Sequence, residues 1–579
     1  MLLGRKDAWA LMGVGLGVAG ASPWLAGEPA VLGALAGPAL GSAWLTYRKT
    51  QEWLNRVDAD KREDFILKSD ETFGELMPTK KGIRLGYTRD NGLPLDIADT
   101  FMTRHTAIIG QSGVGKTILG EYLLWQQAMR GGGFIFIDAK LDAATRDKLA
   151  YMMKLAGRED EFYVLNVDDP QNSNTYNPIL DGDSDEVASR LLNLLPSAEN
   201  SPGADYFRQQ ANYALTVLTG ALKSAKRRYN FSDLAIIMQS DRALESLLRL
   251  PMEAEVRMTL EVFLNQFRKR DKNGTAIDVI KVKEILGGMA GRIAHFAQGK
   301  FGQVFNTYTP EINLTDIVKN NKCLYVMLPT MGKDTAALSL GKMVLSDLRS
   351  AVYNIQGLDA SKRPDPPFLV FADEMGSYVM LGIARLFEQA RSANICMIPA
   401  FQTFANLRAI SPDFEDIIIG NTWNKIFFKF ASKDSPETAA EIIGKTKKFV
   451  RSLSLSESEG ASANNLRATP QGSASKSGGI SESWREDEAY RVMPEHLKSM
   501  GMGEAIVMSG ARVFHIKTPW VKYDEVPPYK AVRHKVSLPP DQLGLDLKDR
   551  YQEFLMAAQD EGAKLAEIDN NSFKNPPSA

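Results

Sequence analysis

Short runs of apolar residues alternate with helical segments in the part of the chain that follows residue 100. Thr106–Ile109, Phe134–Lys140 and Phe162–Asn166 are such runs, the second with a charged end, and Ile118–Met129 has the pattern of a helix. Apolar runs of this length are typical of strands that are buried on both faces. Strands that alternate with helices predict a parallel sheet with helices on both sides, so the expected fold class is α/β.

The alternation stops near Asn177-Pro178 and a different periodicity takes over. From residue 183 to about 317, apolar residues recur at spacings of three and four, which predicts an all-α insertion over residues 181–317. The helices are expected at 205–222, 231–250, 253–269 and 277–296. The strand pattern then resumes at 323–328, 368–374, 395–402, 425–430 and 504–508.

The first fifty residues differ in kind from all the others. Residues 9–25 and 31–47 are apolar and rich in Gly and Ala, and basic residues stand at 5–6 and 48–49. This pattern predicts a transmembrane helical hairpin with both ends in the cytoplasm. The alternatives are a single span with an interfacial segment, or a cleaved signal peptide, since Ala19-Gly20-Ala21 resembles a cleavage site.

The expected domain organisation follows from these patterns. A chain of 579 residues is too long for one core, so two or three domains are expected. We expect a transmembrane hairpin over 1–50 and a connector with the start of the α/β domain over 51–100. The first part of the α/β domain is expected over 101–180, the all-α insertion over 181–317, the second part of the α/β domain over 318–540, and a C-terminal helix and tail over 541–579. Within the second part, residues 451–483 are rich in Ser, Gly and Ala, which predicts a flexible surface excursion.

One segment carries an explicit chemical signature. The segment over residues 110–117 fits the phosphate-loop pattern at every fixed position. Its residues are Gly110, Gln111, Ser112, Gly113, Val114, Gly115, Lys116 and Thr117. The glycines let backbone N–H groups surround the phosphates of a nucleoside triphosphate, the lysine neutralises them, and the hydroxyl of Thr117 ligates Mg²⁺. The position of the segment, between a predicted strand and a predicted helix, is the one that this motif requires. The sequence therefore predicts binding of ATP and Mg²⁺.

Three further polar residues indicate hydrolysis. Asp373 and Glu374 end the apolar run 368–374, and Gln402 ends the run 395–402. We expect Asp373 to hold Mg²⁺ or its water, and Glu374 to be the base that polarises the attacking water. Gln402 is expected to sense the γ-phosphate. The alternatives are an acidic helix cap for the two carboxylates and a strand-capping amide for Gln402.

The net charge limits how the protein can contact DNA, and the cysteine content bears on disulfide bonds. The chain has 69 Lys and Arg against 70 Asp and Glu, a net charge of −1, so that any DNA contact must come from local patches or from the lumen of a ring. Basic clusters at 223–228 and 268–272 are candidates, although solvated helix ends are the simpler interpretation. Cys323 and Cys396 lie in apolar runs, which predicts no disulfide framework.

The order of these parts resembles the coupling proteins of type IV secretion, of the TraD/TraG kind. The shared features are the hairpin, Gly110–Thr117, the all-α insertion, Asp373-Glu374, Gln402 and the Ser-rich excursion. The resemblance implies a RecA-like P-loop ATPase core, a homohexameric ring at the bacterial inner membrane and ATP hydrolysis. It also implies that Lys116, Glu374 and Gln402 serve catalysis and that Arg391 supplies an arginine finger to a neighbouring protomer. A plain surface arginine is the alternative for Arg391.

The implied substrate is single-stranded DNA with its relaxase and relaxosome proteins, delivered to the channel proteins of the secretion system. The alternatives are export of protein effectors, or pumping of double-stranded DNA as in FtsK- and HerA-like motors. A docking scaffold that uses nucleotide only for assembly is a third possibility, which the adjacent Asp373-Glu374 pair disfavours because a scaffold needs no water-activating base. This chain departs from better-known members in the very short turn at 26–30 and in its short C-terminal extension.

Overall fold

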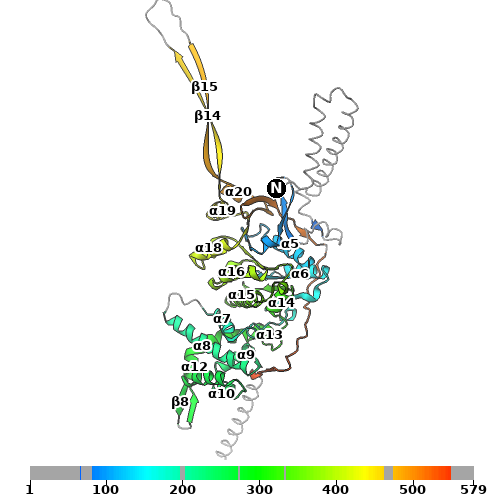
Figure 1. Ribbon diagram of the computed structural model, residues 1–579, viewed down its shortest axis with the longest axis vertical. Helices are drawn as coiled ribbons and strands as arrows, with labels where there is room; N and C mark the ends of the chain where they lie inside the picture. The colour runs from blue at the N-terminus through cyan, green and yellow to red at the C-terminus, as the bar shows by residue number, and fades with distance from the viewer. Residues whose placement is uncertain are drawn as a thin grey trace, which may run out of the picture.

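The chain folds into an α/β body, and a helical body is attached to one end of it (Figure 1). The computed structural model describes residues 65–66, 81–90, 92–195, 202–271, 274–330, 334–461, 474–523 and 525–548. The predicted membrane hairpin over 1–50 lies outside the described residues, as does nearly all of the predicted terminal helix. Among the helices that are described, none is both long and apolar enough to cross a bilayer.

One eleven-stranded sheet organises the α/β body. Its strands, in spatial order, are β3 (Pro94–Ala98), β2 (Gly82–Thr88), β17 (Arg512–Lys517), β16 (Glu504–Ser509), β13 (Asn424–Phe428), β4 (Thr106–Ile109), β12 (Ile395–Phe401), β11 (Phe368–Ala372), β5 (Phe134–Asp138), β10 (Cys323–Met327) and β6 (Phe162–Asn166). The strands from β13 to β6 run parallel, whereas β16, β17, β2 and β3 pair antiparallel. The expected α/β class is confirmed, but the sheet is mixed rather than parallel. A two-residue turn with Gly510 at φ 58° joins β16 to β17, and such a turn permits only an antiparallel pair.

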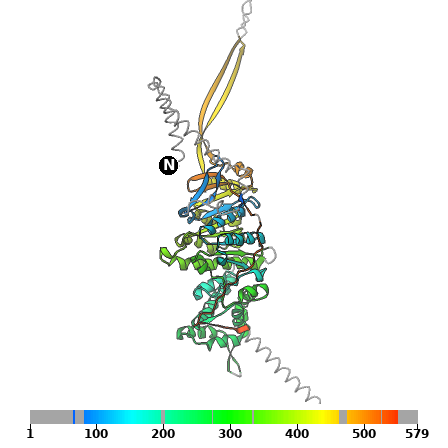
Figure 2. The same cartoon turned by 90° about the vertical axis from the view of Figure 1, so that its right-hand side faces the viewer.

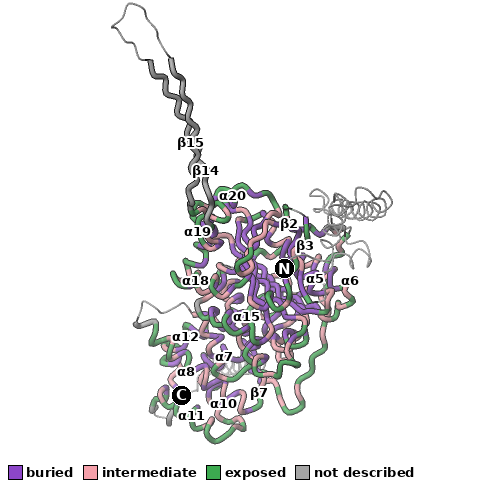
Figure 3. The backbone as a smooth tube through the Cα atoms, turned by 45° about the horizontal axis from the view of Figure 1, so that its top comes forward, coloured by how far each residue is buried: buried purple, intermediate pink, exposed green. Residues whose placement is uncertain are grey.

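Each face of the sheet is covered by helices, and the core lies between them (Figure 3). Helices α5 (Lys116–Met129) and α6 (Ala143–Leu155) pack on one face, and α14 (Leu314–Lys319), α15 (Asp334–Gln356), α16 (Ala384–Gln389) and α18 (Pro412–Asn421) pack on the other. Successive residues of a strand serve opposite faces: Ile108 packs with α5, whereas Ile109 packs with the second set. This two-sided burial explains why the central strands contain almost no polar residue.

Smaller elements complete the α/β body. They are β1 (Phe65–Ile66), which pairs with β18 (Val521–Lys522), and the helices α4 (Asp99–Met102), α17 (Ala405–Arg408), α19 (Ser435–Ile443) and α20 (Pro494–Ser499).

The insertion forms the helical body, with one correction to the prediction. It contains α7 (Ser184–Leu192), α8 (Pro202–Ser224), α9 (Phe231–Ile237), α10 (Asp241–Leu248), α11 (Ala254–Asn265), α12 (Val279–Phe296) and α13 (Gly299–Phe305). It also contains β7 (Arg227–Arg228) and the hairpin of β8 (Arg268–Asp271) and β9 (Gly274–Ile277), so the expectation of an all-α insertion is wrong. Helix α11 ends at Asn265, short of the expected 269, and the Asn-Gly sequence at 273–274 is of the kind that favours a hairpin over a continued helix.

The Ser-rich excursion is also different from what was expected. Strands β14 (Lys445–Ala461) and β15 (Ala474–Tyr490) pair antiparallel in an unbroken register. The ribbon projects from the α/β body at the end opposite the helical body (Figure 2). Composition alone predicted no structure here, because Ser and Gly lack apolar bulk, but a two-stranded ladder satisfies its backbone groups without a core.

An extended segment, residues 525–548, runs from the α/β body down to the helical body; we call it the C-terminal strap (Figure 1). Its His534 ring stacks on Tyr163 beside the sheet, with ring centroids 4.3 Å apart. At the far end, β19 (Leu543–Gly544) pairs with β7, and the Leu547 amide donates to Asp233 Oδ1 at 3.0 Å. Burial raises the pKa of Asp233 to about 6. The basic cluster near residue 226 thus serves partly to hold the strap.

We expect the far end of the strap to be held by two buried leucines. Leu545 and Leu547 are 6% and 9% exposed, whereas Leu543 in the same strand region is 58% exposed. Replacing both buried leucines by Ala should weaken the attachment of the strap end by about 2 kcal/mol or more for each leucine, because the buried apolar contacts are lost. The strap end should then detach more often. Limited trypsin digestion at Lys535, followed by mass spectrometry, should then be faster than in the wild type. Leu543→Ala is the matched control, and equal cleavage rates for all three chains would contradict this attachment.

Candidate functional site

The segment Gly110–Thr117 connects β4 to the first turn of α5, as the motif requires. Gly115 precedes α5 with φ 112°, a backbone conformation that side chains disfavour. At Gly110 a Cβ atom would lie 2.6 Å from Phe428 Cβ, so only glycine fits between β4 and β13. The loop therefore leads directly into the N-terminus of α5, whose first backbone amides have no partner within the helix, and this suits a bound phosphate.

Lys116 is folded back over this loop. Its Nζ donates to the carbonyl oxygens of Gly110 at 2.6 Å and Gln111 at 2.9 Å. The residue is only 4% exposed, and this burial lowers the pKa of its ammonium group. The ammonium group of Lys116 thus lies at the loop, where it would neutralise the oxygens of a bound phosphate.

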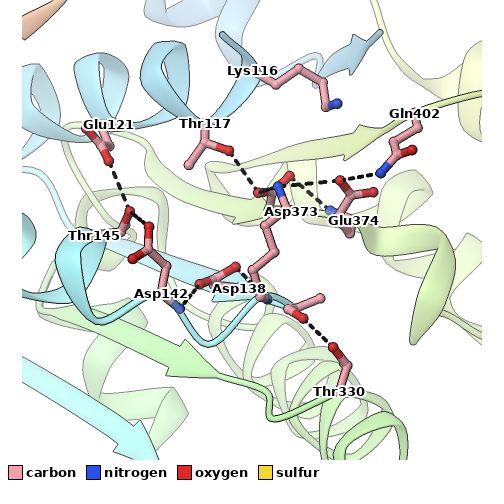
Figure 4. A network of polar contacts seen from close by, with 12 residues as sticks. Lys116, Thr117, Glu121, Asp138, Asp142, Thr145, Thr330, Asp373, Glu374 and Gln402 are labelled. Atoms are coloured by element: carbon pink, nitrogen blue, oxygen red, sulfur yellow. Dashed lines mark hydrogen bonds and ion pairs between the residues drawn. The ribbon is translucent and has the colours of Figure 1, made fainter. Parts of the chain in front are cut away.

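Asp373 follows β11 at the carboxyl edge of the sheet and is completely buried. Its Oδ2 accepts a hydrogen bond of 3.1 Å from Thr117 Oγ1, so the loop and the acidic strand meet across 256 residues of sequence (Figure 4). Two adjacent ligands at about 2.1 Å from an octahedral Mg²⁺ lie about 3 Å apart. The oxygen pair of Thr117 and Asp373 therefore fits a magnesium ion in both chemistry and spacing.

Glu374 has a strained backbone. Its φ of 51° and ψ of 39° are left-handed, which is uncommon for a residue other than glycine. The turn is held because Tyr378 Oη donates to the carbonyl oxygen of Asp373 at 3.0 Å. The carboxylate of Glu374 accepts from Gln402 Nε2 at 3.0 Å and is 14% exposed. Gln402 reaches it from the end of β12, the strand between β4 and β11.

A further cation, Lys140, belongs to the same group of side chains as Thr117, Asp373, Glu374 and Gln402. Its Nζ lies 3.0 Å from Asp373 Oδ2 and 3.4 Å from Glu374 Oε1. Burial alone would lower the pKa of Lys140, but the two carboxylates outweigh burial and the pKa is raised. From the sequence, only a charged end of the run 134–140 could be recognised, because nothing in that run tells which residue reaches β11.

Arg391 is not part of this group. It is exposed and lies in the turn before β12, at the amino edge of the sheet. The seven residues of β12 separate it from Gln402, which corresponds to about 23 Å along a strand. Arg391 therefore cannot reach a phosphate at the loop of its own chain.

Comparisons with known proteins show which proteins this chain resembles. Residues 367–498 match the family described as the TraM recognition site of TraD and TraG. The type 4 coupling protein DotL of Legionella pneumophila is 26% identical over 397 residues, which are 61% of this chain and 50% of DotL. This chain is related to the type IV coupling proteins. The resemblance inferred from the order of the motifs is confirmed.

The family match includes the strand that precedes Asp373 and Glu374, but it covers only part of the chain. The matched region begins just before β11, which precedes Asp373 and Glu374, and the chain spans about half the length of DotL. An uncharacterized protein of Mycoplasma pneumoniae is 30% identical over 106 residues, which are 18% of this chain and 67% of that protein.

Solved structures share the fold. The bacterial conjugative coupling protein TrwBdeltaN70, in its unbound monoclinic form, has a TM-score of 0.50 at 14% identity, and the alignment covers 79% of this chain and 93% of that one. The plasmid coupling protein TrwB in complex with ADP and Mg²⁺ has a TM-score of 0.49 at 14% identity, with 79% and 94% covered. The likeness to TrwBdeltaN70 establishes the common α/β fold.

The left-handed turn at Glu374 gives a direct prediction. Both Glu374→Gln and Glu374→Gly remove the carboxylate, but only glycine adopts this backbone without strain. The Gly variant should therefore be more stable than the Gln variant by about 1 kcal/mol or more. Thermal unfolding of the two variants, measured side by side, checks this. A lower unfolding temperature for Glu374→Gly would show that the turn is not strained.

Proposed function

We propose that this chain is the inner-membrane coupling ATPase of a type IV secretion system. It recruits the relaxosome and uses ATP hydrolysis to translocate single-stranded DNA in conjugative transfer. The observation that carries the proposal is the meeting of Thr117, Asp373, Glu374 and Gln402 at one edge of the sheet, in a relative of the coupling proteins.

The proposed chemistry assigns a separate task to each side chain. The loop amides and Lys116 hold the phosphates, while Thr117 and Asp373 hold Mg²⁺, which polarises the β- and γ-phosphates when bound. Glu374 accepts the proton of the attacking water, and Gln402 orients the Glu374 carboxylate through its 3.0 Å hydrogen bond. An arrangement with a base beside a metal ligand favours hydrolysis over nucleotide-dependent assembly alone.

The larger organisation is also proposed. Six copies form a RecA-like ring, the two apolar segments at 9–25 and 31–47 anchor it in the inner membrane, and the bulk of the chain is cytoplasmic. The ring passes its substrate to the channel proteins of the secretion system. Of the two basic clusters, the structure leaves Arg268 and Lys269 exposed on β8, whereas Lys223 is used internally through its bond to the Leu180 carbonyl. Arg268 and Lys269 are therefore the better candidates for contacts with DNA phosphates.

The first test is ATP hydrolysis by the full chain in detergent, with and without single-stranded DNA. Lys116→Ala and Glu374→Gln should each abolish hydrolysis, by about a hundredfold or more, because they remove phosphate binding and the base, respectively. Lys362→Ala, which changes an exposed lysine paired with Asp359, should leave the rate unchanged.

Stimulation of the wild type by single-stranded DNA supports the DNA motor. Hydrolysis that is indifferent to DNA would instead favour export of protein effectors, and stimulation only by double-stranded DNA would favour an FtsK- or HerA-like pump. Hydrolysis that survives in Glu374→Gln would overturn the assignment of the base.

The position of Arg391 leads to a mixing experiment. An arginine finger at the amino edge can act only on a neighbouring protomer, so Arg391→Ala and Lys116→Ala should each be inactive alone. In equal mixtures, about a quarter of the sites combine an intact loop with an intact neighbouring arginine. Mixed rings should therefore recover hydrolysis to about that fraction of the wild-type rate. No recovery, or an active Arg391→Ala ring, would show that Arg391 is a surface residue.

A further inference from the structure

The proposed hydrolysis assigns no task to Lys140. Its ammonium group bridges the completely buried Asp373 and the nearly buried Glu374, while the lysine side chain itself is 41% exposed. The ammonium group neutralises the charge of the buried Asp373, and it does so on a carboxylate that a metal ion would also need. The bridge between a candidate metal ligand and a candidate base therefore calls for a functional explanation.

Hydrogen bonds of Asp138 and Thr330, both labelled in Figure 4, hold the turn that carries Lys140. The buried carboxylate of Asp138 accepts the amide of Lys140 at 2.9 Å and the amide of Asp142 at 3.0 Å. Tyr325 Oη donates to the same carboxylate at 2.7 Å. Thr330 Oγ1 donates to the carbonyl of Ala139 at 2.5 Å, so the turn is fixed from both sides. Only the side chain of Lys140, beyond this turn, is free to change its position.

One carboxylate oxygen is shared by two groups. Asp373 Oδ2 accepts from both Thr117 Oγ1 and Lys140 Nζ, and this oxygen and the Thr117 hydroxyl are the pair that fits Mg²⁺. A magnesium ion held by this pair would stand beside the ammonium group on the same oxygen. Two cations at such a distance repel each other strongly at a partly buried site.

We propose that Lys140 is a positioning residue that competes with the divalent cation for Asp373. It neutralises Asp373 and Glu374 before the cation arrives, and it must give up Asp373 Oδ2 when Mg²⁺ binds with nucleotide. Lys140 thereby sets how strongly nucleotide binding depends on Mg²⁺. This inference rests on the proposed nucleotide site.

The test is a binding measurement on the full chain in detergent, with a fluorescent ADP. Lys140→Met keeps the length of the side chain and removes its charge. In EDTA the variant should bind ADP about tenfold more weakly than the wild type, because two unneutralised carboxylates face the phosphates. In a Mg²⁺ titration at saturating ADP, the same variant should bind Mg²⁺ about tenfold more tightly, because the competing charge is gone.

Two controls separate this effect from damage to the fold. Lys322→Met changes a lysine that pairs with Asp316 beside β10, at the other edge of the sheet, and it should alter neither affinity. Lys140→Arg keeps the charge and should restore the wild-type dependence on Mg²⁺. A gain in Mg²⁺ affinity is not a result that a partly unfolded site can produce.

The outcomes also separate this inference from the proposed function. Normal ADP binding with the same Mg²⁺ dependence in Lys140→Met as in the wild type would overturn the role of Lys140 and leave the nucleotide site intact. Weaker Mg²⁺ binding in Lys140→Met would overturn it as well. A wild-type chain that binds no ADP, with or without Mg²⁺, would overturn the proposed function together with this inference.

Discussion

The hydrogen bond between Thr117 and Asp373 is the contact on which the candidate site depends. It joins the start of α5 to the end of β11 at a distance of 3.1 Å, although the entire helical body and strands β5, β6 and β10 of the sheet lie between α5 and β11 in sequence. The contact exists because only β12 lies between β4 and β11, and parallel neighbours end at the same edge. Any change that shifts β12 would separate the phosphate loop from its acidic partner.

The two bodies of the molecule are connected by more than the covalent chain. The insertion leaves the sheet after β6 and returns before β10, so its two ends lie beside neighbouring strands. The C-terminal strap adds a third connection, from Tyr163 at the sheet edge to Asp233 in the helical body. The turn that presents Lys140 touches Thr330, in the segment that leads into α15. A movement at the nucleotide edge therefore has physical routes to the helical body.

The sequence predicted the parts of this structure whose causes are local. The phosphate loop requires glycines at fixed spacing, and the central strands require unbroken apolar runs, so both could be located before the structure was known. Glu374 in its left-handed turn and Lys140 on Asp373 could not, because they depend on how distant strands meet. The strap could not be predicted either, since it contacts the two bodies one residue at a time and has no periodicity. The hairpin of β8 and β9 was hidden by basic residues that suit an exposed helix equally well.

The central claim is that Thr117 and Asp373 form the metal site of a nucleotide-hydrolysing motor. The most direct measurement is a structure of the full chain with ADP and Mn²⁺, in which the anomalous signal locates the metal ion. We expect one Mn²⁺ ligated by Thr117 Oγ1 and Asp373 Oδ2, the diphosphate against the Gly110–Thr117 amides, and Lys140 Nζ withdrawn from Asp373. A metal ion bound elsewhere, or a diphosphate that does not touch the loop, would contradict it.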